Sequence, residues 1–142
     1  MYATREDMVR LFGERECVSL TDRRYTGLID DDVMNNSLIQ ASAEIDGYLC
    51  GRYPVPWADE PRVLVGKCCH ITRYLLCGSD TQMTVAIRER YEDTVRYLEK
   101  IAAGKITLGR TETGEVVRSG TGARVVSGSR VFGRDQTGGG GF

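Results

Sequence analysis

The sequence has no long apolar run and only one histidine. None of its apolar stretches approaches the roughly 20 residues that a membrane helix needs, so we expect no membrane contact. The first ten residues include Arg5, Glu6, Asp7 and Arg10 and lack the apolar run of a signal peptide, so we expect synthesis in the cytoplasm. With His70 as the only histidine, neither a Ser-His-Asp triad nor a paired-carboxylate site can be argued. We therefore expect neither enzyme activity nor a cofactor.

The cysteines do not indicate a disulfide framework. There are five of them, an odd number, and three fall in a helical apolar pattern, namely Cys68, Cys69 and Cys77. Beside His70 they raise the alternative of a zinc site or a thiol enzyme, which bound zinc would support. However, the sequence has no C-x-x-C pair, and neighbouring side chains on a helix point about 100° apart. We interpret these thiols as reduced core residues.

The glycines do not form a phosphate-binding loop. Gly120-Thr121-Gly122 lacks the third glycine of a dinucleotide fingerprint, because position 125 is valine. Gly66-Lys67 is not followed by serine or threonine, as a P-loop requires.

Helical spacing of apolar residues predicts a mainly α body over residues 1–104, with three to four helices in a small bundle. Thr4 is the predicted cap of the first helix, which Gly13 ends. Residues 17–29 are predicted to be a connector with at most one short turn. The other helices are predicted over 31–53, from Pro61 to Gly78, and over 81–103.

The segment from Asp22 to Val33 has the outline of a calcium loop, with Gly27 at its sixth position. Its third position is Arg24 and its twelfth is Val33, where calcium needs an oxygen ligand and a bidentate glutamate. We interpret the segment as a turn followed by a capped helix. Tyr48, Tyr53, Trp57 and the nearby prolines are likewise interpreted as a core-closing loop rather than a binding corner.

The last third of the chain has a different composition. Of 17 glycines, 11 lie at or after Gly104. Residues 105–142 carry six basic and three acidic side chains, a charge of +3, whereas residues 1–104 carry −4. Short β-like runs occur in this region, at Lys105–Leu108, Glu115–Arg118, Ala123–Val126 and Ser129–Phe132.

This composition predicts an extended, Gly-rich C-terminal arm over 105–142, with a hairpin around Thr113-Gly114. Such an arm buries too little apolar surface to order itself, so we expect an acidic groove of a partner to hold it. The candidate partner-binding residues are Arg124, Arg130, Phe132, Arg134 and Phe142. A solvated loop and a nucleic-acid-binding arm remain the alternatives; tight, salt-dependent DNA binding would favour the second.

Several segments in order along the chain resemble one family, the small head-tail connector (adaptor) proteins of Mu-like tailed bacteriophages. The resemblance covers nearly the whole chain. It rests on Met1-Tyr2-Ala3-Thr4-Arg5-Glu6-Asp7, Leu20-Thr21-Asp22 leading to Ile29-Asp30-Asp31, Ala41-Ser42-Ala43-Glu44-Ile45-Asp46-Gly47-Tyr48-Leu49, Arg52-Tyr53-Pro54-Val55-Pro56, Ile71-Thr72-Arg73-Tyr74-Leu75 and Ser129-Arg130-Val131-Phe132-Gly133-Arg134-Asp135. Relatives often have a more acidic stretch where Arg23-Arg24-Tyr25 stands here.

The resemblance implies a non-enzymatic virion protein at the head-tail junction. Similar adaptors form a homo-oligomeric ring, with about twelve copies expected, closed by head-to-tail contacts between identical chains. The ring would lie between the portal protein and a tail terminator or tail-completion protein. It would extend the channel through which genomic DNA passes without specific recognition.

Overall fold

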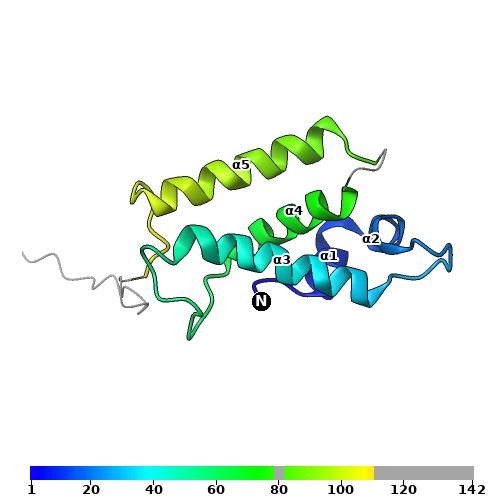
Figure 1. Ribbon diagram of the computed structural model, residues 1–142, viewed down its shortest axis with the longest axis horizontal. Coiled ribbons are helices and arrows are strands. Elements are labelled where there is room, and N and C mark those ends of the chain that lie inside the picture. Colours follow the sequence, from blue (N-terminus) through cyan, green and yellow to red (C-terminus); the bar gives the residue numbers. More distant parts are fainter. Residues whose placement is uncertain (79–81, 111–142) are drawn as a thin grey trace, which may run out of the picture.

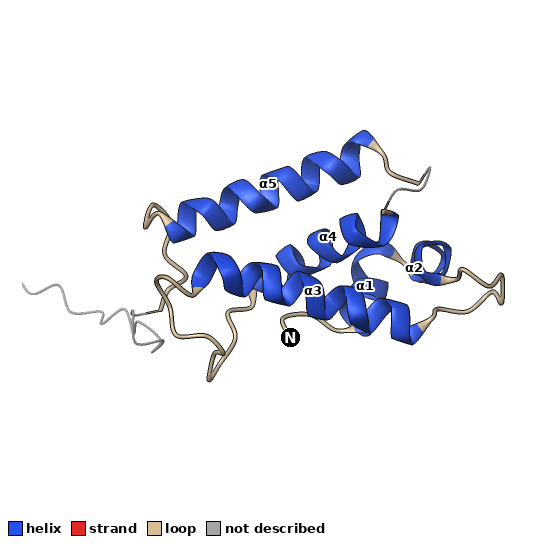
Figure 2. Cartoon of the chain, viewed as in Figure 1, coloured by secondary structure: helices blue, strands red, loops and turns tan. Residues whose placement is uncertain are grey.

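The computed structural model describes residues 1–78 and 82–110, which contain five helices and no β-strand. The helices are α1 (Arg5–Phe12), α2 (Glu14–Thr21), α3 (Asp31–Leu49), α4 (Val63–Cys77) and α5 (Val85–Ala102). The prediction of a mainly helical body is confirmed, with one helix more than the predicted three to four (Figure 2). No helix in the described part of the chain is long and apolar enough to cross a membrane.

The two short N-terminal helices form a corner around Gly13. Thr4 caps α1 in a reciprocal capping box with Asp7, as the sequence predicts for its start. Gly13 has a φ of 86°, which a side chain would disfavour, and it joins α1 directly to α2. The predicted connector over 17–29 is therefore wrong in its first part, because α2 extends to Thr21 and buries Cys17.

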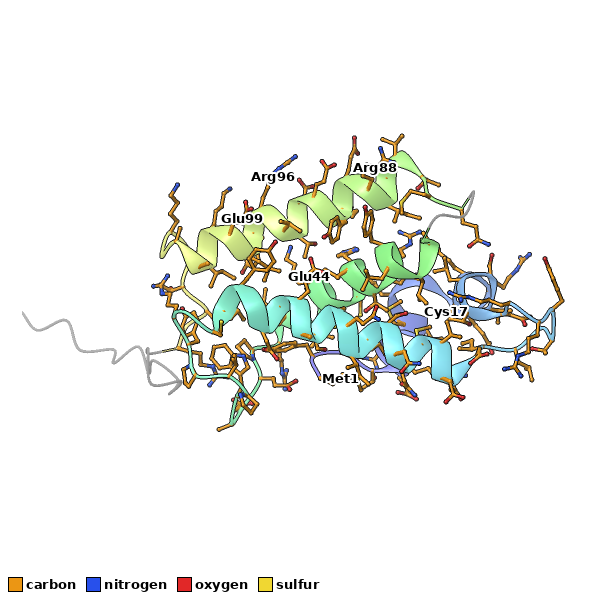
Figure 3. The ribbon with its side chains drawn as sticks, in the orientation of Figure 1. Met1, Cys17, Glu44, Arg88, Arg96 and Glu99 are labelled. Atoms are coloured by element: carbon orange, nitrogen blue, oxygen red, sulfur yellow. The ribbon has the colours of Figure 1, made fainter. Side chains whose placement is uncertain are left out.

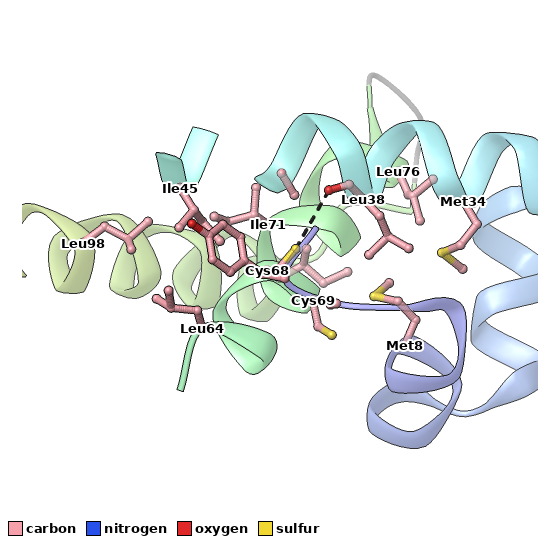
Figure 4. Close-up of a cluster of buried hydrophobic side chains, with 14 of the residues drawn as sticks. Met8, Met34, Leu38, Ile45, Leu64, Cys68, Cys69, Ile71, Leu76 and Leu98 are labelled. Atoms are coloured by element: carbon pink, nitrogen blue, oxygen red, sulfur yellow. Dashed lines mark hydrogen bonds between the residues drawn. The ribbon is translucent and has the colours of Figure 1, made fainter. Parts of the chain in front are cut away.

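The three long helices, α3, α4 and α5, lie beside one another and alternate in direction (Figure 1). α4 is the central element, since it packs against α3, α5, α1 and α2. The core between these helices contains fully buried aliphatic and sulfur-containing side chains (Figure 4), among them Met8, Met34, Leu38, Ile45, Leu64, Cys68, Ile71 and Leu98. Residues 1–4, which precede α1, cover one side of the core, where the amide of Tyr2 donates to the hydroxyl of Ser42.

Three predicted helix boundaries differ from the structure. α3 ends at Leu49 rather than at 53, where the amide of Arg52 bonds three residues back to the carbonyl of Leu49 and tightens the chain into a turn. α4 begins at Val63 rather than at Pro61, after a tight turn. α5 begins at Val85 rather than at 81, because the Thr84 hydroxyl accepts a hydrogen bond from the Ile87 amide and caps the helix there.

The segment with the outline of a calcium loop is a turn, as predicted. The carboxylate of Asp22 accepts hydrogen bonds from the amides of Thr26, at 2.9 Å, and Gly27, at 2.6 Å. These bonds hold the pKa of Asp22 below its usual value. Asp30 then caps α3 by accepting from the amide of Val33, so each carboxylate satisfies backbone groups of its own turn or helix end.

Candidate functional site

The residues that the sequence singles out for partner binding, Arg124, Arg130, Phe132, Arg134 and Phe142, lie outside the described residues, as do three of the four predicted β-like runs. The structure does describe where the predicted arm leaves the body. We call residues 105–110 the arm root. The β-like run predicted at Lys105–Leu108 is wrong: this segment is not a strand, and its Ile106 and Leu108 pack against the core.

Arg52 fastens the arm root to the body. It follows the end of α3, and its Nη1 donates to the carbonyl of Ile101 at 2.8 Å and to that of Ile106 at 3.4 Å. Both carbonyls lie at or just past the end of α5, where the helix dipole favours a positive charge. Gly104 has a φ of 78°, and a Cβ there would lie 3.1 Å from Arg52 Nη1. The glycine predicted to end the last helix therefore also makes room for this guanidinium.

Two further contacts hold the arm root on the loop between α3 and α4. The amide of Leu108 donates to the hydroxyl of Tyr53 at 3.3 Å. Arg110 donates to Asp59 at 2.7 Å, and the arginine side chain is 11% exposed whereas that of Asp59 is 76% exposed. The arginine stem is thus covered by the body, and the chain leaves it at a defined place beside this loop.

The loop that receives the arm root is itself packed, as its prediction as a core-closing loop requires. The rings of Tyr53 and Trp57 are 5.2 Å apart, and Tyr53 is buried. The indole of Trp57 donates to the hydroxyl of Tyr2 at 2.9 Å, and that hydroxyl donates to Asp46. Burial, and next the hydrogen bond to Asp46, raise the pKa of Tyr2. This network ties the first residues, α3 and the loop together beneath the arm root.

The two faces of α5 differ in character. The outward face is densely charged, with both signs interspersed, and Arg96 bridges Glu92 and Asp93 on it (Figure 3). The inward face buries Ile87, Thr94, Leu98 and Ile101. Beside them Tyr91 stacks on Tyr74 with ring centroids 3.9 Å apart and donates to Glu44 at 2.9 Å. The outward charges on α5 are exposed, as on the solvated face of an amphipathic helix.

The thiols near His70 have the environment of core residues, which supports their prediction as such. Cys17, Cys68, Cys69 and Cys77 are buried. Burial raises the pKa of all four, that of Cys69 to about 12, so the nucleophilic thiolate is disfavoured. Burial and then the cations Lys67, Arg90 and Arg73 lower the pKa of His70. In residues 1–78 and 82–110 no three His, Cys, Asp or Glu side chains gather as metal ligands would.

Sequence reasoning missed the residues that hold the arm root. Arg52 fell inside a predicted helix, and its partners Ile101 and Ile106 follow it by 49 and 54 residues. Asp59 and Arg110 are 51 residues apart. The only signal in the sequence was Gly104, whose role at the end of α5 indicated where the body stops.

Comparison with known proteins shows which family the chain belongs to. The family model described as Bacteriophage Mu, Gp36 matches residues 2–127. The chain belongs to the bacteriophage Mu Gp36 family. The match includes all five helices and the arm root and continues into the predicted arm.

Two curated relatives are similar to this Gp36-family chain over almost their whole length. The Mu-like prophage FluMu protein gp36 of Haemophilus influenzae is 36% identical over 135 residues, which cover 95% of this chain and 94% of the relative. Gene product J of Escherichia phage Mu is 34% identical over 139 residues, which cover 96% of this chain and 97% of the relative. The chain is therefore a Mu-like phage protein.

Proposed function

We propose that this chain is a non-enzymatic structural protein of the virion, a head-tail connector. About twelve copies form a ring by head-to-tail contacts between identical chains. The ring lies between the portal protein and a tail terminator or tail-completion protein and extends the channel for DNA. Support comes from the resemblance to head-tail connectors of several segments that follow one another along the chain. Further support comes from membership of the bacteriophage Mu Gp36 family.

The observation that carries the proposal is the fastened arm root. The long helices lie side by side, and the arm root lies at one end of them, beside the loop between α3 and α4 (Figure 1). Arg52 and the Arg110–Asp59 pair fix the place at which residues 111–142 leave the body. A fixed starting point lets every copy present its arm in the same direction to its neighbour, as a repeating assembly requires.

The arm joins the ring to its neighbours in this proposal. Arg124, Arg130 and Arg134 pair with carboxylates of the adjacent subunit, the portal or the tail-terminator ring. Phe132 and Phe142 fill apolar pockets there, and β-like runs add to a neighbour's exposed strand.

The surroundings of the thiols favour a structural role over thiol chemistry. Burial of Cys68 and Cys69 raises their pKa, which opposes formation of the thiolate that nucleophilic catalysis or zinc binding needs. The densely charged outer face of α5 suits a solvated surface in a soluble assembly.

A DNA-binding module is the second candidate. The observation that favours it is the run from Arg118 to Arg134, which contains four arginines and no acidic residue. Against it stands the charge of −4 on residues 1–104, which repels DNA. Binding of the full chain to duplex DNA, measured over a range of salt concentrations, separates the two: tight and steeply salt-dependent binding supports the module.

Truncation of the arm tests the connector role. A chain lacking residues 128–142 should supply no joined particles when it replaces the full chain in a Mu-like phage. Its thermal unfolding should match that of the full chain, because the arm root and its contacts remain. Arg96→Ala is a matched control, since it changes an exposed residue of α5 and should leave joining intact. Infectious particles formed with the truncated chain would contradict the role proposed for the arm.

A further inference from the structure

The outward side of α3 differs from that of α5 because it carries no charge over its central part. Its exposed residues from Asn36 to Gly47 form a ridge about 16 Å long. We call it the α3 ridge: Asn36, Ile39, Gln40, Ala43 and Gly47. Ile39 is 57% exposed in its centre, whereas the exposed residues of α5 from Arg88 to Lys100 are all charged. Depletion of charge with an exposed large apolar side chain is typical of the centre of a protein interface.

Two glycines within helices, Gly47 near the end of α3 and Gly66 near the start of α4, have no explanation in the packing of the described residues. Glycine is less favourable inside a helix than any residue except proline. A Cβ built at Gly47 in α3 or at Gly66 in α4 meets nothing within 4 Å. Neither has a positive φ, so the backbone does not require glycine at either site. The missing side chain then serves to let another backbone approach these helices closely from outside the chain.

Gly66 lies on a partly exposed strip of α4. We call it the α4 strip: Val63, Gly66, Lys67, His70 and Arg73. α1 flanks it, with the Phe12 ring 5.7 Å from the His70 ring and under the guanidinium of Arg73. α5 flanks the other side, with the Tyr97 ring 4.5 Å from the Lys67 ammonium. α1 and α5 do not contact each other across it within the described residues.

The ridge and the strip lie on opposite sides of the body. Cys68 faces α3, because its thiol contacts the Ser42 hydroxyl and the Leu38 carbonyl. Gly66 and His70 are each two residues from Cys68, roughly 200° around the helix, so they face away from α3. On α3 itself Gly47 lies roughly 200° from the buried Ile45, so it faces away from α4.

We propose that the α3 ridge of one copy of this chain packs on the α4 strip of the next copy. Two different faces on opposite sides of one body make a heterologous contact, which repeats from copy to copy and gives a ring when the rotation between copies closes. This inference rests on the proposed function and names the surfaces that build the ring. The α3 ridge of each copy covers the α4 strip of the next copy. In a closed ring, both faces of every copy are therefore covered.

The register of this contact follows from the two glycines. Within one chain α3 and α4 run antiparallel (Figure 1), and neighbouring copies in nearly the same orientation keep that direction. With Gly47 set opposite Gly66, Ala43 falls opposite His70 and Gln40 opposite Arg73. The Gln40 carbonyl can then accept from the guanidinium, and no cation on the ridge opposes the strip.

Disulfide trapping tests the register directly. Two cysteines bridge when their Cα atoms are about 4.4–6.8 Å apart, a separation that helices reach where glycines face each other. In a Cys50→Ser background, which removes the one exposed thiol, chains carrying Gly47→Cys and Gly66→Cys are mixed under mild oxidation. The expected product is a dimer that contains one chain of each kind. Glu89→Cys, on the outer face of α5, replaces Gly47→Cys as the matched control and should not cross-link to Gly66→Cys.

Sedimentation of the full chain measures the same contact without cysteines. Gly47→Leu should weaken self-association about tenfold or more, because the side chain fills the space that the facing helix needs. Glu89→Leu should leave self-association unchanged. A chain that self-associates without the mixed disulfide and is insensitive to Gly47→Leu overturns these surfaces while the proposed ring stands. A chain that stays monomeric at about 1 mM also overturns them. Joining of heads to tails, measured separately, decides the proposed function.

Discussion

The guanidinium of Arg52 donates a 2.8 Å hydrogen bond to the carbonyl of Ile101, although the two residues are 49 positions apart. This bond joins the end of α3 to the end of α5 and lies beneath the arm root. Contacts within the helical body therefore fix the place where the predicted arm begins.

Replacement of Arg52 by leucine should lower the free energy of unfolding. The carbonyls of Ile101 and Ile106 lose a charged donor, which costs about 1–3 kcal/mol. Urea-induced unfolding followed by circular dichroism measures the change. Arg62→Leu is the matched control, because Arg62 is exposed and should change stability little. Equal stability of the two variants would contradict the role given to Arg52.

The same substitution should have opposite effects at two glycines. Gly104→Ala should destabilise the chain by about 1 kcal/mol or more, because φ is positive and the new Cβ meets Arg52 at 3.1 Å. Gly47→Ala should stabilise the monomer by about 0.5–1 kcal/mol, since nothing lies within 4 Å of the new methyl group. Thermal and urea unfolding at low protein concentration compare them; effects of the same sign would refute the comparison.

One thiol of the five should react in the native protein. Cys50 is exposed, whereas the other four are buried and burial raises their pKa. At pH 8 a thiol reagent such as Ellman's should therefore label one cysteine rapidly and the remaining four only after unfolding. Cys50→Ser should abolish the rapid phase. Rapid native labelling of two or more thiols would show that the core around Cys68 opens readily.

Tyr91 should make stability depend on pH in the alkaline range. Burial, followed by its hydrogen bond to Glu44, raises the pKa of Tyr91 from 10.0 to about 12. The native state therefore holds this proton more tightly than the unfolded chain. The resulting stabilisation is complete below pH 10 and is lost as pH rises from about 10 to 12. Tyr91→Phe should be less stable near pH 7 but should lose less stability over the alkaline range in urea titrations. A slope equal to that of the unchanged chain would contradict this assignment.

Local signals in the sequence predicted much of the helical body. Thr4 beside the start of an apolar periodicity located the start of α1, because a cap satisfies amides of its own first turn. The predicted turn followed by a capped helix located the start of α3, which Asp30 caps. The turn at Asp22 could be predicted for the same reason, since it depends on residues four and five positions away.

Features that depend on distant contacts could not be predicted. α2 was missed because its short apolar pattern becomes a helix only where Cys17 meets the core. α3 stops at Leu49 although its pattern continues, because contacts far along the chain hold the residues after it. The Arg52 side chain bonds to Ile101 in the last turn of α5, and the Tyr53 hydroxyl accepts from the Leu108 amide after that helix. The arm root was assigned to a β segment because nothing near Leu108 in the sequence shows that Tyr53 receives its amide.

Joining of separate heads and tails tests the connector role most directly. A Mu-like phage that lacks this chain should produce DNA-filled heads and complete tails that stay apart in electron micrographs. Addition of the purified full chain to that mixture should join them and restore infectivity, whereas the chain lacking residues 128–142 should not. Joined, infectious particles formed without the chain would contradict the proposed function.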